Sequence, residues 1–101
     1  MGKAKEISIG RNNFVRQLDA LAYFKTMLGR YDLWATVSAE DADDLRALLS
    51  RHKDVLDKVG TGVRSFKVIK DEYKGRCFGV ERTDGTTVDF SYIRCVTLRW
   101  N

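Results

Sequence analysis

The second half of the chain alternates apolar and polar side chains, and this period of two constrains the fold more than any other feature. It runs through three segments, residues 63–70, 76–82 and 87–92. Strict alternation is typical of strands that bury one face and expose the other. The connections between the segments are short, so neighbouring strands must run antiparallel. We therefore expect a three-strand antiparallel meander, to which residues 95–100 could add a fourth strand.

The parity of the apolar positions sets the register of this meander. Successive side chains point to opposite faces, so residues that share the core must pair even with even. A two-residue turn at Asp84-Gly85 would pair even positions with odd ones. A three-residue turn, Thr83-Asp84-Gly85, keeps the match and gives Gly85 the left-handed conformation that such turns need. The predicted neighbours are Val80 with Val88, Phe78 with Phe90, Phe66 with Val80, and Val68 with Phe78.

The odd positions then form the opposite face, which is mostly polar and is expected to face water. Its central row holds Lys67, Gly79 and Asp89. Gly79 has no side chain, so we expect Lys67 and Asp89 to pair across it. A second interpretation is a divalent-metal site made by Glu81, Asp89 and Lys67, which would suit phosphodiester hydrolysis. No histidine or third acid completes it, so we rank it below a solvated face. The flanking rows are Ser65, Glu81 and Thr87, and Ile69, Cys77 and Ser91. The even face keeps the aromatic rings, Tyr92 included, inside and away from any base-stacking role.

The first half of the chain has helical periodicity instead. Residues 6–10 suggest a short strand, and a helix is expected over residues 14–28, capped by Asn12 or Asn13 and ending at Gly29. Its predicted core face is Phe14, Leu18, Leu21, Ala22 and Leu28. In the loop 30–37, we expect Tyr31, Leu33, Trp34 and Val37 to pack onto the core.

Ser38 is typical of a helix N-cap, and the acids after it complement the positive end of the helix dipole. Apolar residues at a three-four spacing, Leu56 among them, then continue to Gly60, as one long helix or two short ones. Strand, helices and then meander indicate an α+β fold in which two or three helices cover one face of the sheet. We expect residues 1–101 to form a single domain.

Composition excludes several classes of function. No apolar run approaches the roughly 20 residues of a membrane span, and the N-terminal residues are too polar for a signal peptide, so we expect a cytoplasmic protein. Cys77, Cys95 and His52 cannot supply the four ligands of a structural zinc site. We expect no metal and no cofactor, and we expect both cysteines to be reduced thiols.

The net charge of +4 lies in the second half, where eleven Lys and Arg oppose seven Asp and Glu. Cations surround the flexible stretch Gly60-Thr61-Gly62, whose amides could hold a phosphate, although no Walker motif is present. Each part also has a structural interpretation: Gly60 as the end of a helix, the cations as complements to that helix end, and His52 as a residue packed on an apolar seam. The candidate nucleic-acid-binding residues are Arg51, His52, Lys53, Lys58, Gly60, Gly62, Arg64, Arg82 and Arg94.

Three stretches carry a family resemblance: LLSRH, KVGTGV and RCFGVERTDGTTVDFSYIRC, within residues 14–96. In order and spacing they resemble the small domain of the plant DCL family ("defective chloroplasts and leaves"). The resemblance implies a role in ribosomal RNA processing, and a related domain ends a plant-specific RNA polymerase subunit. The resemblance implies no catalytic role for the residues that match the family signature, among them His52, Lys58, Arg82 and Asp89. Lys53 and Ile93 depart from the family pattern, because relatives often have proline and a basic residue there.

We therefore expect a non-enzymatic RNA-associated module, monomeric, with RNA as its partner. The alternative is a protein-interaction domain that uses Trp34 in loop 30–37, or Trp100, if either is exposed. A metal-dependent phosphodiester hydrolase at Glu81 and Asp89 ranks third.

Overall fold

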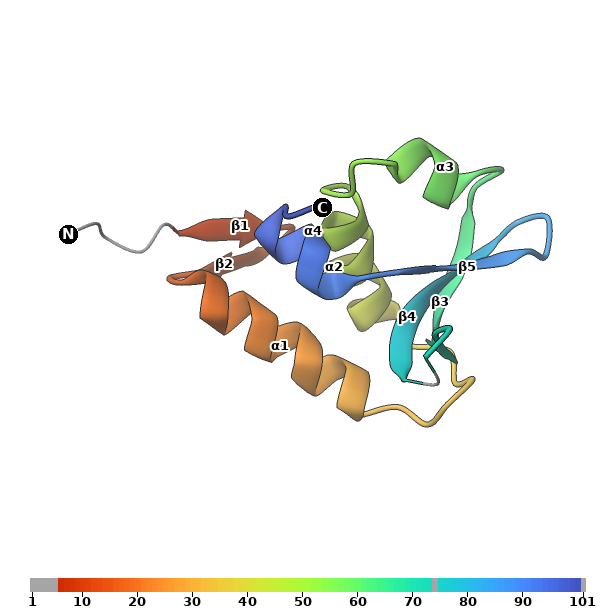
Figure 1. Cartoon of the computed structure of the whole chain (residues 1–101), viewed down its shortest axis with the longest axis horizontal. Helices are drawn as coiled ribbons and strands as arrows, with labels where there is room; N and C mark the ends of the chain where they lie inside the picture. Colours follow the sequence, from red (N-terminus) through yellow and green to blue (C-terminus); the bar gives the residue numbers. More distant parts are fainter. Residues whose placement is uncertain (1–5, 74, 101) are drawn as a thin grey trace.

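The computed structural model describes residues 6–73 and 75–100, and it confirms an α+β fold. Figure 1 shows a hairpin at one end, a three-stranded sheet at the other and helices between them. In the described residues, no helix is both long enough and apolar enough to cross a membrane. In chain order the elements are β1 (Ile7–Ile9), β2 (Asn12–Phe14), α1 (Gln17–Gly29), α2 (Ala39–Leu49), α3 (Val55–Val59), β3 (Val63–Lys70), β4 (Arg76–Arg82), β5 (Thr87–Phe90) and α4 (Tyr92–Thr97).

The predicted register of the meander is confirmed. The strands lie in the order β3-β4-β5, all antiparallel. Each predicted neighbour is observed: Phe66 with Val80, Val68 with Phe78, Phe78 with Phe90, and Val80 with Val88. The three-residue turn also forms, since the N–H of Arg82 donates to the carbonyl of Thr86 and Gly85 has a φ of +89°.

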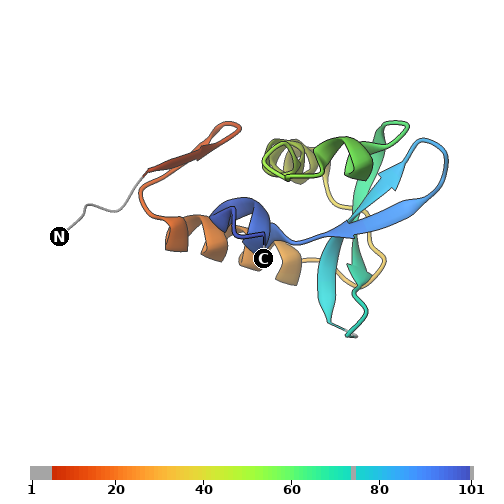
Figure 2. The same cartoon turned by 45° about the horizontal axis from the view of Figure 1, so that its top comes forward.

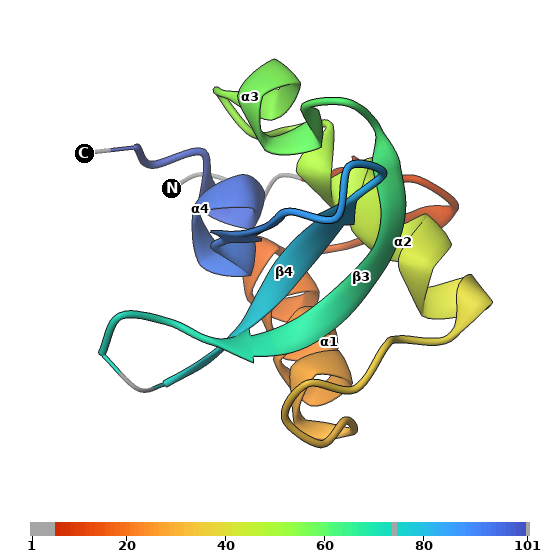
Figure 3. The same ribbon diagram turned by 90° about the vertical axis from the view of Figure 1, so that its right-hand side faces the viewer.

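The even face of the sheet is the core, as predicted. Phe66, Val68, Phe78, Val80 and Phe90 are all buried. Figure 3 shows the sheet in front of α1, α2 and α4, so these helices cover one face. Their contribution to the core includes Phe24, Met27, Leu45, Leu48, Cys95 and Val96.

The predicted first helix begins three residues too early. Asn12 and Asn13 cap no helix, because they lie in β2, which pairs with β1 in a hairpin. Helix α1 starts at Gln17 after Arg16, whose side chain makes no capping hydrogen bond. The predicted core face is correct at Phe14, Leu21 and Leu28, which pack against the core. It is wrong at Leu18, which is 64% exposed, and at Ala22, which is also exposed, while Ala20, Phe24 and Met27 are buried. Figure 2 shows the hairpin at the far end from the large sheet, where it pairs locally and turns the chain into α1.

The predicted strand over residues 95–100 is wrong, because this segment contributes to a helix. Strand β5 ends at Phe90, and the Ser91 hydroxyl accepts a hydrogen bond from the N–H of Arg94 at 3.2 Å, which caps α4. Tyr92 is therefore helical rather than the last residue of the strand. Leu98, with a φ of +60°, ends the helix.

Residues 38–59 form two helices. Ser38 caps α2 as predicted, since its hydroxyl accepts from the N–H of Asp41 at 3.1 Å. Residues 50–54 separate α2 from the short α3. In α3 the predicted apolar seam holds at Val55 and Val59, which pack against the core, and fails at Leu56, which is 84% exposed.

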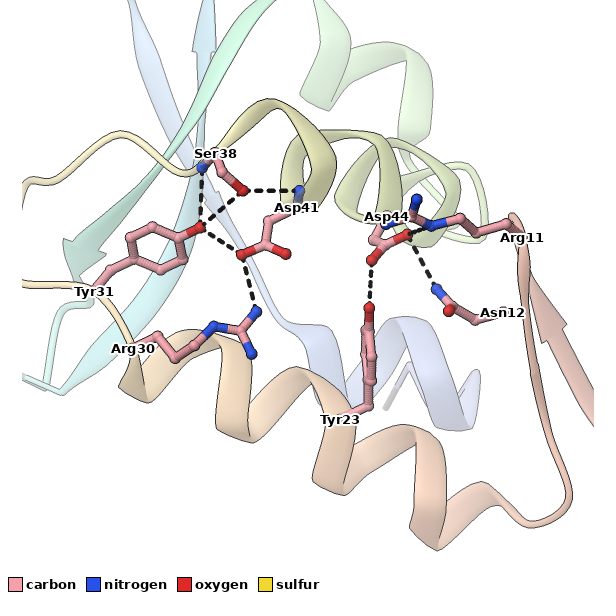
Figure 4. Close-up of polar contacts among 8 residues, drawn as sticks. All are labelled: Arg11, Asn12, Tyr23, Arg30, Tyr31, Ser38, Asp41 and Asp44. Carbon is pink, nitrogen blue, oxygen red and sulfur yellow. Dashed lines mark hydrogen bonds and ion pairs between the residues drawn. The ribbon is translucent and has the colours of Figure 1, made fainter.

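Buried carboxylates tie α2 to the elements around it (Figure 4). Asp44 accepts hydrogen bonds from the Tyr23 hydroxyl at 2.5 Å, Asn12 Nδ2 at 3.0 Å and Arg11 Nε at 3.2 Å. Asp41 accepts from the Tyr31 hydroxyl and, at 3.0 Å, from Arg30 Nη2. Burial alone would raise the pKa of Asp41, but these donors hold it below its ordinary value. Asp41 and Asp44 therefore stabilise the packing of α2 against its neighbours, in addition to complementing the helix dipole.

Loop 30–37 lies along the edge of β3. The N–H of Trp34 donates to the carbonyl of Val68 at 2.6 Å, and that of Val37 donates to Phe66 at 2.9 Å. Val37 is buried as predicted. Trp34 is 61% exposed, so its predicted packing onto the core is wrong. Its φ of +73° is unusual for a large residue and belongs to the turn that leads into this edge pairing.

Candidate nucleic-acid interface

A groove of about 600 Å³ lies where five segments meet, and we call it the lateral groove. The segments are the turn after α2, helix α3, the tip of the β3–β4 hairpin, the β5–α4 junction and the end of the chain. Figure 3 shows the hairpin tip, α4 and the C-terminal segment on the same side of the molecule. The lining residues are His52, Lys53, Asp54 and Lys58, then Asp71, Glu72, Tyr73, Arg76 and Cys77, then Asp89, Phe90, Ser91, Tyr92, Ile93 and Arg94, and finally Trp100.

Four of the predicted binding residues line the lateral groove: His52, Lys53, Lys58 and Arg94. Lys58 is partly buried because it crosses from α3 to β5. Its Nζ donates to the main-chain carbonyl of Asp89 at 2.7 Å and lies 3.8 Å from the Asp89 carboxylate. Among the described residues, Lys53 and Arg94 have no ion pair or side-chain hydrogen bond, and both are exposed. These two cations are therefore available to a ligand.

His52 and Trp100 pack together at one wall of the groove. Their ring centroids are 4.4 Å apart, and Lys53 Nζ lies 5.9 Å from the centroid of the Trp100 ring. His52 is only 9% exposed, and its Nδ1 accepts a hydrogen bond from the N–H of Asp54 at 2.9 Å. Burial, followed by the positive charge of Lys58, lowers the pKa of His52 below its ordinary value. The structure places His52 both in a packed position and at the groove.

Two predicted binding arginines hold the main chain together outside the groove lining. Arg51 Nε donates to the carbonyl of Cys95 at 2.7 Å and its Nη2 donates to that of Val96 at 3.1 Å, near the end of α4. Arg82 donates to the carbonyls of Asp57 at 2.6 Å and Lys58 at 3.1 Å in α3. Cations at helix C-termini satisfy carbonyls that lack helical partners. Both arginines thereby fix helices that border the groove.

The glycine stretch has internal partners for its amides. The N–H of Gly60 donates to Leu56 and that of Gly62 donates to Val59, each at 2.9 Å. Gly60 closes α3 with a positive φ, as its structural interpretation predicted. Arg64 Nη2 donates to the carbonyl of Thr83 at 3.2 Å, away from the groove lining. The structure thus separates Gly60, Gly62 and Arg64 from the four groove residues.

The charges of the groove are balanced rather than strongly basic. Asp71 Oδ1 accepts from the N–H groups of Tyr73 and Gly75, each at 2.8 Å, and so shapes the hairpin tip. Arg76 donates to the carbonyl of Tyr31 and is directed toward the loop before α2. The groove cations are Lys53, Lys58, Arg76 and Arg94, and the groove acids are Asp54, Asp71, Glu72 and Asp89.

The polar face of the sheet differs from the prediction in its pairing. Lys67, Gly79 and Asp89 do share a row, but Lys67 pairs with Glu81 at 3.2 Å. The side chain of Ile69 fills the space over Gly79, where an added Cβ would lie 2.7 Å from Ile69 Cδ1. This apolar side chain blocks the expected approach of Lys67 to Asp89.

The proposed metal ligands of this face have protein partners. Glu81 accepts from the Ser65 hydroxyl at 2.7 Å, and this bond together with Lys67 lowers the pKa of Glu81. Across residues 6–73 and 75–100, no group of three or more His, Cys, Asp or Glu side chains could hold a metal ion. Cys77 and Cys95 are free thiols, as expected, and burial raises their pKa values to about 11 and about 12.

Sequence reasoning missed the aromatic part of the groove. Tyr73 is 85% exposed at the hairpin tip, and Tyr92 and Trp100 are partly exposed. Tyr92, which was expected inside, lies in α4 and is partly buried against the core, where its ring meets that of Phe78 edge-on with centroids 6.2 Å apart. In the sequence, only the position of Tyr73 in a turn indicated an exposed ring. Tyr92 and Trp100 reach the groove because of the positions of α4 and of the segment that follows it.

Comparisons with known proteins show both plant and bacterial relatives. The chain is 32% identical over 98 residues to DNA-directed RNA polymerase IV subunit 1 of Arabidopsis thaliana, covering 94% of this chain and 7% of that protein. It is 29% identical over 96 residues to Protein EMBRYO DEFECTIVE 514 of the same plant, covering 93% of this chain and 48% of that protein. The expected likeness to part of a plant RNA polymerase subunit is confirmed, while membership of the DCL family stays a prediction.

A solved structure shares the fold. The solution NMR structure of an uncharacterized protein from Rhodospirillum rubrum superposes with a TM-score of 0.84 at 44% identity, covering 94% of this chain and 91% of that chain. The family model described as "Protein of unknown function (DUF3223)" matches residues 25–96, which include α2, α3 and the whole three-stranded sheet. The chain therefore belongs to the DUF3223 family.

Proposed function

We propose that this chain is a non-enzymatic RNA-associated module whose lateral groove holds a short single-stranded segment. The observation that carries the proposal is the meeting of accessible cations and aromatic rings in one groove. Lys53 and Arg94 would contact phosphates, and Tyr73 and Trp100 would stack with bases. Proteins that bind single strands combine these two kinds of contact.

Balanced charge in the groove favours a single strand over a duplex. A duplex presents dense phosphate charge and hides the base faces, so it needs an extended basic surface. Four acids oppose four cations in this groove, which leaves little long-range attraction for a duplex. An unpaired strand can offer bases to the aromatic rings and needs few phosphate contacts. The likeness to an RNA polymerase subunit agrees with an RNA-associated role, and ribosomal RNA maturation is the process we propose for it.

NMR titration of the labelled protein with short single-stranded and duplex RNAs tests this proposal, since it reports both affinity and location. Single strands should shift the signals of the groove residues more than duplexes do. With two or three phosphate contacts, affinity should fall about tenfold as salt rises from about 50 to about 200 mM. Shifts confined to other surfaces, or no shifts with any RNA, would refute the proposal.

Charge reversal at the accessible cations is the sharper test. Lys53→Glu and Arg94→Glu should each weaken RNA binding several-fold without unfolding the protein, because both side chains are exposed. Lys25→Glu on α1 is the matched control: it changes the net charge equally on an exposed side chain outside the groove. An equal loss in all three variants would indicate non-specific attraction by net charge alone.

The exposed Trp34 favours a second candidate function, a protein-interaction domain. Its backbone is held by the hydrogen bond to Val68, so a large apolar ring is displayed on an ordered loop. If this function holds, a partner should remain bound after nuclease treatment and be lost in Trp34→Ala. Sedimentation over a range of concentrations would reveal whether that partner is a second copy, against our expectation of a monomer.

A further inference from the structure

His52 is nearly buried, yet one of its ring nitrogens is left for a ligand. Nδ1 accepts from the N–H of Asp54 at 2.9 Å and therefore carries no proton. The proton of the neutral ring must then lie on Nε2, which becomes a hydrogen-bond donor. The hydrogen bond to the main chain thus sets both the tautomer and the orientation of the ring.

The Nε2–H group is reachable from solvent. In the described part of the chain, no hydrogen bond to Nε2 is present, and no buried side-chain nitrogen or oxygen lacks a partner. Nε2 must therefore be accessible, and the lateral groove is the hollow that His52 lines. A donor on a side chain that is 9% exposed, held in orientation from behind, is suited to meet an acceptor that enters the groove.

Its surroundings include an aromatic wall that suits a nucleic-acid base. Lys53 and Lys58 supply the positive charge that attracts a phosphate, whereas the neutral ring, with Nδ1 occupied, offers an uncharged hydrogen-bond donor. Trp100 packs against the ring at 4.4 Å and gives this wall of the groove an apolar, aromatic character. Nucleic-acid bases offer neutral carbonyl and ring-nitrogen acceptors at their edges, and their faces suit contact with aromatic rings.

We propose that His52 Nε2–H donates a hydrogen bond to an acceptor atom on the edge of an unpaired base bound in the lateral groove. His52 would thus read the base while Lys53 and Arg94 contact phosphates. This inference rests on the proposed RNA-binding function and adds a residue that distinguishes bases from backbone.

Two substitutions separate the two ring nitrogens. In His52→Asn, the side-chain oxygen can take the place of Nδ1 and keep the bond from Asp54, but the distal donor is gone. In His52→Gln, the amide reaches the position of Nε2 and can donate there. His52→Asn should weaken RNA binding roughly three- to tenfold, whereas His52→Gln should retain most of it. Urea unfolding of both variants checks that each is folded.

An abasic oligonucleotide shows whether the acceptor belongs to a base. The wild type should bind a single-stranded RNA more tightly than an abasic strand of equal length, and His52→Asn should reduce that preference. If His52→Asn weakens binding to both strands equally, the acceptor is a phosphate or sugar and the proposal is overturned. It is also overturned if His52→Asn binds RNA as well as the wild type does.

The wild-type protein provides a measurement that does not depend on the folding of a variant. Nitrogen-15 NMR of the ring should report the Nε2–H tautomer in the free protein, and RNA should shift the Nε2 signal and slow exchange of its proton. An unchanged Nε2 signal at saturating RNA would contradict the proposal. If no RNA binds at all, the proposed function itself fails, whereas binding that depends on Lys53 and Arg94 but not on His52 refutes this inference alone.

Discussion

Gly60→Ala is expected to destabilise the protein by about 2–3 kcal/mol, for two reasons that can be separated. Gly60 has a φ of +55° and a ψ of −122°, a conformation that alanine adopts at a cost of about 1–2 kcal/mol. Its added Cβ would also lie 2.8 Å from Arg82 Nε. Displacing Arg82 would weaken its two hydrogen bonds to the α3 carbonyls. These bonds are partly exposed and together contribute about 1 kcal/mol to the free energy of unfolding.

Urea unfolding of four proteins measures the two contributions: wild type, Gly60→Ala, Arg82→Ala and the double variant. In the Arg82→Ala background, Gly60→Ala should cost about 1 kcal/mol less, because no guanidinium remains to be displaced. Gly85→Ala supplies the backbone cost alone, since Gly85 has a φ of +89° and nothing lies within 4 Å of its added Cβ. The reasoning is refuted if Gly60→Ala costs the same in both Arg82 backgrounds and no more than Gly85→Ala.

Acidification should destabilise the protein as pH falls below 6.5, the ordinary pKa of histidine, because the unfolded chain then binds a proton that the folded His52 resists. Stability curves against pH check this, and His52→Asn should flatten the curve in that window. Asp44→Ala should cost about 2–4 kcal/mol in urea unfolding, because the partly buried donors around this buried carboxylate, such as the Tyr23 hydroxyl, lose a charged acceptor. The control Asp43→Ala, at an exposed neighbouring position, should cost under about 0.5 kcal/mol, and equal effects would contradict the assigned role. Thiol labelling at about pH 8 should be slow at both cysteines, because burial raises the pKa of both thiols. Labelling of Cys95, whose pKa is raised to about 12, should require unfolding, and rapid labelling of Cys95 in the native protein would contradict its burial.

The sheet could be predicted in register because its determinants are local. Apolar parity and the length of the turn at Gly85 together suffice to pair Phe78 with Phe90, since a one-residue slip would place charged side chains in the core and a two-residue slip would change the turn. The cap at Ser38 is local in the same sense, as its hydroxyl bonds an N–H three residues away.

The errors occur where local preference was weak and distant contacts decided. The pattern of Val96, Leu98 and Trp100 is the alternation of a strand. Residues 92–97 nevertheless form a helix, because Ser91 caps it, Cys95 and Val96 are buried against α1 and α2, and Arg51 donates hydrogen bonds to its last carbonyls. Asn12 and Asn13 suit a helix cap, but pairing with β1 places them in a strand.

For the candidate site, charge in the sequence identified the cations but could not sort them. Arg82 and Lys53 carry the same charge, so the sequence does not distinguish their roles. Only the position of α3 gives Arg82 two carbonyls to which it donates hydrogen bonds, while Lys53 remains in the groove lining. The groove itself depends on the meeting of Tyr73, Trp100 and His52, which are far apart in the chain. Periodicity and turn length, which act over a few residues, therefore determined the sheet and its buried face. The assignment of each charged or aromatic side chain to the groove or to the scaffold depended on long-range packing, which no local pattern records.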